Sequence, residues 1–590
     1  MKNNGKSNEL DLWNRKECSP DETIIRIRSI LSKYGIPTSL TAEYDYKELW
    51  YSNRLELLST TFIGSNGKGV SREYAIASAY GEFMERIQSK FLLNGLFFRK
   101  FEPSNNNKQI SSMVLKKIHS RYTNLSDLSN AISKYETVKY NFVPNGKEIN
   151  LPDIYINLTC GSNGLASGNT FAEAFCQGTC EIFERYVVRE IYYGTYDVGT
   201  FGRVDESLYR DTKSFTMIEA IRSKGYSVTI IDCTLGNRLP VLGILLQDPT
   251  LLKYHFRLAS DINLDICLQR CITEIFQGIN FDLRFRLHMN REEINYSGTD
   301  FWNNINIDQE YTRTIIDGTG KLPKRFFLQQ MQHCDTLTIF SPENMTNDEA
   351  AKHILLLAKQ WSNEVYVANL TKLGFPTIRI FIPGLSECFY YDKVPLDKVF
   401  NLFSNLKKNF MEDRVFERVF LDELLLLVKM YPYTYNFNLT KVFGILVRNV
   451  EGSEFVYDVD LLIALLSCLH GERELVLKHA KKYCENSNFD MRKTFIVGST
   501  LDAIVSDIKL ETFCKYMTMY SINAEELTLI NSFYSFITHG FPIKGCANCN
   551  NCYLRENCLI DEVKRIVKII DTSPEPLVEE YAKFLENLKS

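Results

Sequence analysis

The sequence predicts an α+β protein in which a mixed core is followed by a region that is nearly all helix. One loop–helix unit occurs twice, at Ser65–Arg86 and Ser162–Arg185, each with Ser-Asn-Gly, an Ala-containing helix and Glu-x-x-Glu-Arg. Strand patterns and helices are interspersed up to about Asp392, and amphipathic helices dominate after it. We therefore expect an internally duplicated core at residues 1–392 and a helical region at 393–590.

The composition is that of an ordinary globular protein, with 45% hydrophobic and 24% charged residues among 590. A net charge of −4 and a pI of about 6.2 argue against direct binding of nucleic acid. The N-terminus lacks a signal-peptide pattern, and no apolar run is long enough for a bilayer, so we expect no membrane partner. The cytoplasm is the expected location, where the 16 cysteines would be thiols or metal ligands rather than disulfides.

The first expected helix runs from Asp21 to Gly35. Lys16 and Thr23 flank its start, where free backbone N–H groups and a basic side chain suit a phosphate. Taken alone, these two residues are explained more simply as a solvated lysine and a helix cap.

A strand pattern at residues 54–64 leads into the first Ser-Asn-Gly loop. The segment GSNGKG at 64–69 lacks the Gly-x4-Gly-Lys-Ser/Thr spacing of a Walker loop, which excludes that interpretation. Further strands are expected at 149–160, 227–234, 240–248, 254–261, 364–371 and 377–384.

The helix after the second Ser-Asn-Gly loop carries Glu173, Gln177, Glu181 and Glu184 at steps of four, four and three. This spacing places all four on one face of a helix, between apolar neighbours. The pattern indicates a buried helix that directs carboxylates toward a charged ligand.

The duplicated helix repeats this face with Ser78, Glu82, Glu85 and Ser89. A weaker third copy places Arg270, Glu274 and Gln277 on one face. Buried carboxylates without partners are costly, so five of them near one site favour Mg²⁺ held between protein acids and a nucleotide. A purely structural network of salt bridges is the alternative.

The helical region contains short amphipathic helices at close spacing. The pair between Asp460 and Cys484 resembles a tetratricopeptide (TPR) unit, but the repeat is too degenerate to be assigned by its period. A TPR-like stack and a plain helical bundle both remain open.

The segment 546–558 places four cysteines in one polar stretch with C-x2-C-x2-C-x5-C spacing. Thiolates so close together suit a soft metal, and the spacing resembles an iron–sulfur loop more than a zinc ribbon. A run of reduced surface thiols is the alternative. The possible ligands are Cys546, Cys549, Cys552 and Cys558.

Together these motifs resemble the YcaO-domain family, whose mark is a pair of Glu-x-x-Glu(-Arg) helices around an ATP site. The resemblance covers most of the chain. It rests on RKECSPDET at 15–23, NGKG…GEFMER, SNGLASGNT…EIFER, QRCITEIFQG and FIPGLSE. One departure is Ala166, which stands where the family often has serine, with Ser167 following it.

Carried over by position, the resemblance implies a magnesium and ATP site, with no catalytic residue assigned. Magnesium ligands are expected at Glu82, Glu85, Glu181 and Glu184, with Glu173 close by. Nucleotide contacts are expected at Lys16, Thr23, Asn169, Arg185 and Arg270, and we include Glu274 on the face of Arg270.

Family members use ATP to activate a backbone amide oxygen as a phosphorylated hemiorthoamide, which makes loss of that oxygen feasible. The chain ends in FLENLKS, without the Pro-x-Pro-x-Pro tail of many azoline-forming members. It therefore resembles the stand-alone type, which acts as an accessory factor for β-methylthiolation of an aspartate in a small-subunit ribosomal protein.

That resemblance implies a radical methylthiotransferase as partner and a homodimeric assembly. Two alternatives stay open at this point. The first is a cyclodehydratase or thioamide synthase that acts on a ribosomally made peptide. The second is a non-enzymatic helical scaffold switched by ATP.

Overall fold

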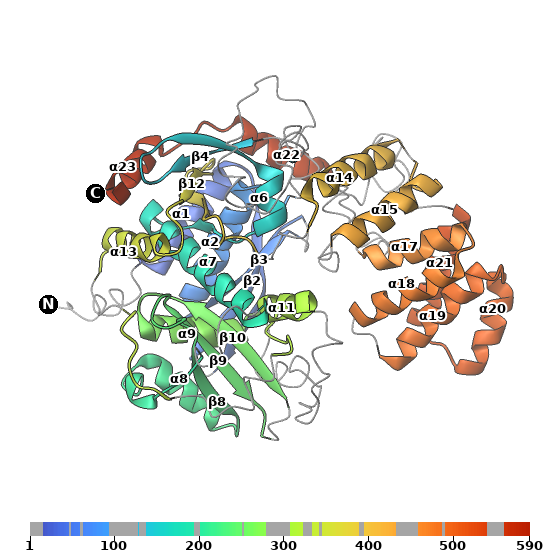
Figure 1. The fold of residues 1–590 in the computed structure, drawn as a ribbon, viewed down its shortest axis with the longest axis horizontal. Helices are drawn as coiled ribbons and strands as arrows, with labels where there is room; N and C mark the ends of the chain where they lie inside the picture. Colours follow the sequence, from blue (N-terminus) through green and yellow to red (C-terminus); the bar gives the residue numbers. More distant parts are fainter. Residues whose placement is uncertain are drawn as a thin grey trace.

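A computed structural model gives the structure of the chain. It describes residues 16–46, 49–59, 63–93, 128, 137–193, 201–249, 253–278, 307–322, 333–340, 345–388, 394–412, 414–431, 458–486, 490–539 and 560–589. The four cysteines at 546–558 lie outside these residues. The described chain is a mixed core of three sheets and their helices, beside which the helical region lies (Figure 1).

The first sheet is antiparallel and has the order β1 (Thr38–Tyr46), β2 (Trp50–Leu57), β3 (Gly64–Gly69). It packs against α2 (Arg72–Gln88), which in turn contacts α1 (Pro20–Lys33). Apolar side chains of these elements form one buried cluster, which includes Leu55 and Phe83. Helix α1 begins at a capping box in which Ser19 and Glu22 satisfy each other's backbone N–H groups.

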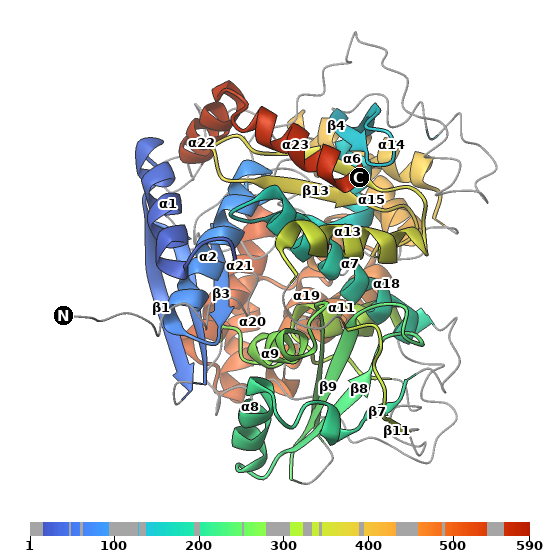
Figure 2. The same cartoon turned by 90° about the vertical axis from the view of Figure 1, so that its left-hand side faces the viewer.

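The second sheet has five strands in the order β5-β4-β12-β13-β6. Helix α7 contacts β13 and β6, and it also contacts α13 and α23. Figure 2 shows α7 in the middle of the core, between the sheets. The elements are β4 (Thr137–Phe142), β5 (Glu148–Pro152), α6 (Asp153–Cys160), β6 (Leu165–Ser167), α7 (Phe171–Tyr193), α13 (Asn347–Lys359), β12 (Tyr366–Asn369), β13 (Thr377–Phe381) and α23 (Val578–Lys589).

The third sheet has five strands in the order β10-β9-β8-β7-β11. Helices α8 and α9 pack on it beside a cluster of buried aliphatic side chains. The elements are β7 (Arg203–Val204), a 3-10 turn (Glu206–Leu208), α8 (Lys213–Arg222), β8 (Ser227–Asp232), β9 (Val241–Gln247), β10 (Tyr254–Ser260), α9 (Leu264–Ile275), α11 (Ile307–Ile316) and β11 (His333–Cys334).

The helical region forms a separate layer of antiparallel neighbours in Figure 1, with α17, α18 and α19 in mutual contact. Its elements are α14 (Leu396–Met411), α15 (Arg418–Met430), α17 (Val459–Leu469), α18 (Arg473–Asn486), α19 (Met491–Val505), α20 (Leu510–Met517), a 3-10 turn (Thr518–Tyr520) and α21 (Ala524–His539). The expected helical character is confirmed, and the TPR-like arrangement stays a prediction.

The chain then returns to the core through α22 (Ile560–Thr572) and α23. Val563 and Ile566 join the buried cluster of the first sheet, whereas Phe584 joins the cluster around α7. The predicted division at residues 392 and 393 stays a prediction, and these two helices pack with the first part of the chain.

Two local expectations are wrong. The Gly-rich segment expected as a loop is strand β3, because its backbone pairs with β2. The segment expected as one strand at 149–160 ends its strand at Pro152 and continues as α6. Proline has no N–H for a sheet ladder and suits the start of a helix, which explains the change at this residue.

Candidate functional site

Helices α2 and α7 begin with the same local structure. Ser71 accepts a hydrogen bond from the backbone N–H of Tyr74, and Thr170 accepts one from that of Glu173. Two residues before each cap lies a glycine, Gly69 or Gly168, with no room for a side chain. A Cβ there would lie 2.7 or 2.8 Å from a backbone nitrogen of the following helix. The expected duplication is therefore present in the caps as well as in the acids.

The third copy has the same register. Asn263 caps α9 by accepting a hydrogen bond from the backbone N–H of Ile266. Counted from the caps, positions 7, 11 and 14 hold polar side chains in all three copies. These side chains are Ser78, Glu82 and Glu85 on α2, Gln177, Glu181 and Glu184 on α7, and Arg270 and Glu274 on α9 with Gln277 just after its end.

All nine of these side chains line one cavity of about 650 Å³. The same cavity is lined by Lys16, Thr23, Asn169, Glu173 and Arg185. All residues that the sequence assigns to the magnesium and nucleotide site thus line one cavity. The cysteine segment, a separate predicted metal site, lies outside the described residues. Their roles as ligands stay predictions.

The start of α1 closes one corner of the cavity. The Lys16 ammonium lies 2.7 Å from a carboxylate oxygen of Glu173. The Asn169 amide donates to the Thr23 hydroxyl at 3.0 Å. Arg26 donates to the backbone carbonyl of Asn169 at 3.1 Å, which fixes the loop before α7.

Arginines offset only some of the acids. Arg86 lies 3.1 Å from Glu85, and Arg185 lies 3.0 Å from Glu181. Glu184 forms no ion pair within the described part of the chain. Burial raises the pKa of Glu85 well above its usual range despite Arg86, and burial also raises the pKa of Glu184. Without a ligand, burial therefore disfavours the charged forms of these two carboxyl groups.

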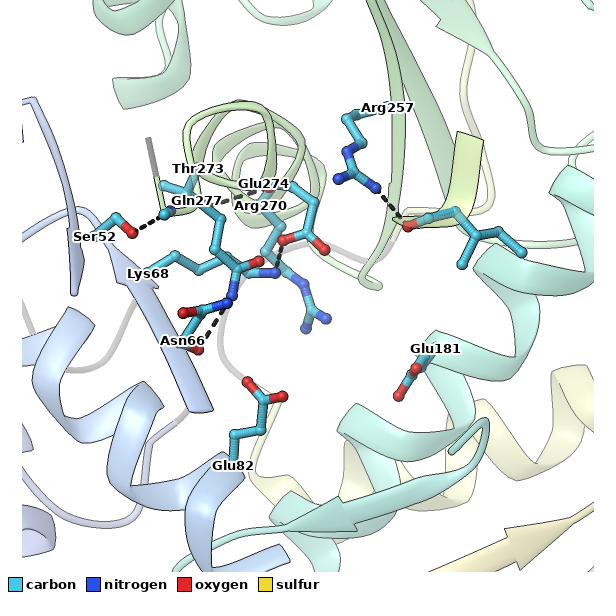
Figure 3. A network of polar contacts seen from close by, with 12 residues as sticks. Ser52, Asn66, Lys68, Glu82, Glu181, Arg257, Arg270, Thr273, Glu274 and Gln277 are labelled. Atoms are coloured by element: carbon cyan, nitrogen blue, oxygen red, sulfur yellow. Dashed lines mark hydrogen bonds and ion pairs between the residues drawn. The ribbon is translucent and has the colours of Figure 1, made fainter. Parts of the chain in front are cut away.

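Arg270 is the matching surplus cation. Its guanidinium points into the space between Glu82 and Glu181 (Figure 3). It forms no hydrogen bond or ion pair with any residue that the structure describes. The guanidinium is half-buried, and despite this burial the nearby carboxylates of Asp261 and Glu184 raise its pKa. Because its N–H donors have no direct partner there, this part of the cavity suits an anionic ligand.

The donor set fits a divalent cation together with a polyanion. Carboxylates whose charge is penalised by burial gain from Mg²⁺, which takes carboxylate and phosphate oxygens together. Among the described residues, no three Asp, Glu, His or Cys side chains lie close enough to hold a metal ion by themselves. A metal ion bound here would therefore need phosphate or water oxygens to complete its coordination shell.

Sequence reasoning missed some residues of the cavity. Lys68 was set aside with the Walker pattern, yet its ammonium forms an ion pair with Glu274 across the cavity (Figure 3). Its place before Gly69 in the repeated unit was the available signal. Ser167 lines the cavity but donates its hydroxyl hydrogen to the Gly81 carbonyl at 2.7 Å.

A comparison with known families assigns the class of protein. The family model described as "YcaO cyclodehydratase", ATP- and Mg²⁺-binding, matches residues 66–386. This is more than half of the chain, and the chain belongs to the YcaO family.

Two relatives narrow the comparison. The ribosomal protein S12 methylthiotransferase accessory factor YcaO of Escherichia coli (strain K12) is 23% identical over 402 residues, which is 63% of this chain and 66% of the relative. An uncharacterized protein of Haemophilus influenzae is 22% identical over 367 residues, which is 56% of this chain and 58% of the relative. The chain thus spans two thirds or less of the length of these relatives.

Solved structures are more distant. YcaO from Methanopyrus kandleri, bound with AMPPCP and Mg²⁺, has 13% identity and a TM-score of 0.40, covering 64% of this chain and 93% of that one. A heterocyclase in complex with substrate and cofactor has 16% identity and a TM-score of 0.42, covering 63% and 53%. Among the residues that the structure describes, no helix has the length and apolarity required to cross a bilayer.

Proposed function

We propose that this protein uses ATP and Mg²⁺ to activate a backbone amide of a protein or peptide substrate. One observation carries the proposal. Three helices with the same cap register bring acids to one cavity, where neither Glu184 nor the side chain of Arg270 forms a direct ion pair or hydrogen bond with a residue that the structure describes. A metal–polyphosphate complex offsets both charges at once.

Glu82, Glu85, Glu181 and Glu184 would hold Mg²⁺, with Glu173 close by. When bound, the metal supplies Lewis acidity toward phosphate oxygens. Arg185 and Arg270 would donate forked hydrogen bonds to the phosphates. Asn169, Thr23 and Lys16 would position the nucleotide from the side of α1.

Glu184→Gln tests this assignment by calorimetry of ATP binding with and without Mg²⁺. The substitution keeps the size of the side chain and removes its charge, so magnesium-dependent binding should be abolished. Glu580→Gln, on an exposed position of α23, is the matched control and should bind ATP as the unchanged protein does. Unchanged binding by the Glu184 variant would remove the magnesium role of this residue.

In the cell, we propose an accessory role in β-methylthiolation of a small-subunit ribosomal protein, in partnership with a radical methylthiotransferase. The name of the E. coli relative supports this role. Mass spectrometry of ribosomal protein S12 from a deletion strain tests it. An unchanged level of methylthio-aspartate would exclude it.

A peptide-modifying role is the second candidate, because the description of the matching family names cyclodehydratases. Its test is a search for loss of one water from a short precursor peptide encoded beside the gene. If the protein is instead a scaffold switched by ATP, it should bind the nucleotide without hydrolysing it, whether or not a substrate is present.

A further inference from the structure

Lys68 is a charged residue of the cavity to which the proposed function gives no role. It lies on β3, opposite Ser52 of β2, between two glycines that hold the strand against α2. A Cβ on Gly67 would lie 1.9 Å from the Ala75 carbonyl oxygen, so no other residue fits there. The backbone of Lys68 is thereby fixed, while its flexible side chain extends into the cavity.

The partner of Lys68 is Glu274. In the other two helices, the glutamate at the matching position pairs with an arginine of its own helix. Glu82 and Glu181 each have an arginine four residues later on the same helix. In the third copy the matching residue after Glu274 is Gly278, which lies beyond the end of α9 and whose backbone N–H donates to the Ser52 hydroxyl. Glu274 therefore takes its cation from another element, and that cation is a lysine.

The third copy also lacks the net negative charge that the other two direct into the cavity. At the position of Ser78 and Gln177 it carries Arg270. The position of Glu85 and Glu184 is held, just after the helix, by the neutral Gln277, whose amide donates to the Asn66 carbonyl at 3.1 Å. The cavity thus has an acidic part made by α2 and α7, and a basic corner made by Lys68 and Arg270.

The single carboxylate of Glu274 does not balance the two positive charges of this basic corner. Burial, with Arg270 as the next cause, lowers the pKa of Lys68 to about 8, despite the attraction of Glu184 and Glu82. Arg270 has no partner among the described residues. An anion with more than one charge would stabilise both cations, as the phosphates of a nucleotide do.

We propose that Lys68 is a phosphate-binding residue, which exchanges Glu274 for a phosphate oxygen of the bound nucleotide. This inference rests on the proposed function, because it names a further contact in the same site. A lysine suits an exchange of partners better than arginine does, since its ammonium is a point charge on a flexible stem. The alternative is a fixed ion pair that only joins β3 to α9.

The test is Lys68→Met, with binding of Mg²⁺–ATP, ADP, AMP and adenosine measured by calorimetry. Loss of a charged hydrogen bond to phosphate should weaken ATP binding about 10-fold or more. Adenosine has no phosphate, so its affinity should change less than about 2-fold. The ligand at which the loss first appears identifies the phosphate that Lys68 contacts. Lys68→Arg should recover part of the affinity.

Lys372→Met is the matched control, because it removes a similarly half-buried ammonium from an ion pair with Glu575 outside the cavity. Thermal unfolding without ligand separates the two roles of Lys68. A fixed ion pair predicts a lower midpoint for Lys68→Met and an equal loss for all four ligands, which would overturn the inference. Unchanged ATP affinity would also overturn it and leave the proposed function standing. Failure of the unchanged protein to bind any nucleotide would instead refute the proposed function.

Discussion

Lys16 and Glu173 lie 157 positions apart in the chain and form an ion pair of 2.7 Å at the mouth of the cavity. The pair joins the segment before α1 to the first turn of α7. Lys16 is about one third exposed, so this contact adds little to stability. Its value lies in placing an ammonium beside the predicted nucleotide.

Lys16→Ala should therefore weaken Mg²⁺–ATP binding roughly 10-fold with little change in the unfolding midpoint. Calorimetry and thermal unfolding measure the two effects. Lys33→Ala removes a lysine from the far end of α1, where it lies over the Tyr34 ring, and should leave ATP affinity unchanged. Equal affinities in the unchanged protein and the Lys16 variant would exclude a nucleotide contact there.

Glu85→Gln should stabilise the protein without ligand and impair it with ligand. Because burial raises the pKa of Glu85, its ionisation costs folding free energy above the pKa of the unfolded chain, and the neutral amide avoids this cost. We expect a higher unfolding midpoint near pH 8 and a smaller gain on adding Mg²⁺ and ATP.

The pH dependence distinguishes this effect from better packing. The advantage of Glu85→Gln should shrink as the pH falls toward 5, where the carboxyl group is protonated in the folded protein. An advantage that is constant with pH would contradict the electrostatic explanation. Glu73→Gln, in the exposed first turn of α2, should show neither effect.

Binding of ATP should take up protons at Lys68. An added phosphate raises the pKa of the ammonium from about 8, so near pH 8 binding takes up roughly half a proton, and near pH 6.5 almost none. Calorimetry in two buffers of different ionisation enthalpy measures this uptake. The difference between the unchanged protein and Lys68→Met isolates Lys68 from the acids. Equal uptake in both would contradict the contact.

Tyr581→Ala should destabilise the core by about 2–4 kcal/mol, because the ring is buried and its hydroxyl donates to the Val367 carbonyl at 2.9 Å. The ring also contacts Phe171 at the start of α7. Thermal unfolding measures the loss, and the exposed Glu579→Ala should change stability by less than about 0.5 kcal/mol. An unchanged free energy of unfolding for Tyr581→Ala would show that α23 does not stabilise the core.

The metal site predicted at the cysteine segment is tested separately. Iron and zinc analysis of protein purified without oxygen should find one of these metals if the four thiolates bind a cluster or ion. Replacing Cys549 with serine should remove most of the metal. The absence of both metals in the unchanged protein would exclude this site.

The sequence predicts the acidic faces well, because the 3.6-residue period places Glu181 and Glu184 on one side of a helix in any fold. Expectations for single strands are less reliable. The segment at 149–160 has apolar residues that suit a strand or a buried helix, and only Pro152 marks the change. Periodicity alone cannot separate the two for short apolar runs.

Contacts between distant segments could not be predicted from local patterns. Lys68 lies four residues after the end of the strand expected at 54–64, and its partner Glu274 follows about two hundred residues later. Only the packing of β3 and α9 around one cavity brings their charges together. The return of α22 and α23 to the core was missed for the same reason, since their amphipathic pattern does not name the surface they cover.

That return makes the helical layer an excursion anchored at both ends rather than a tail. Cutting the chain at residue 392 would remove Val563 and Tyr581 from the apolar clusters they complete, leaving the first part of the chain with uncovered apolar surface. Internal excision of the layer, with the two exits rejoined, is the deletion that respects this architecture. A protein that binds the helical layer would therefore act on the first part of the chain at two separate places.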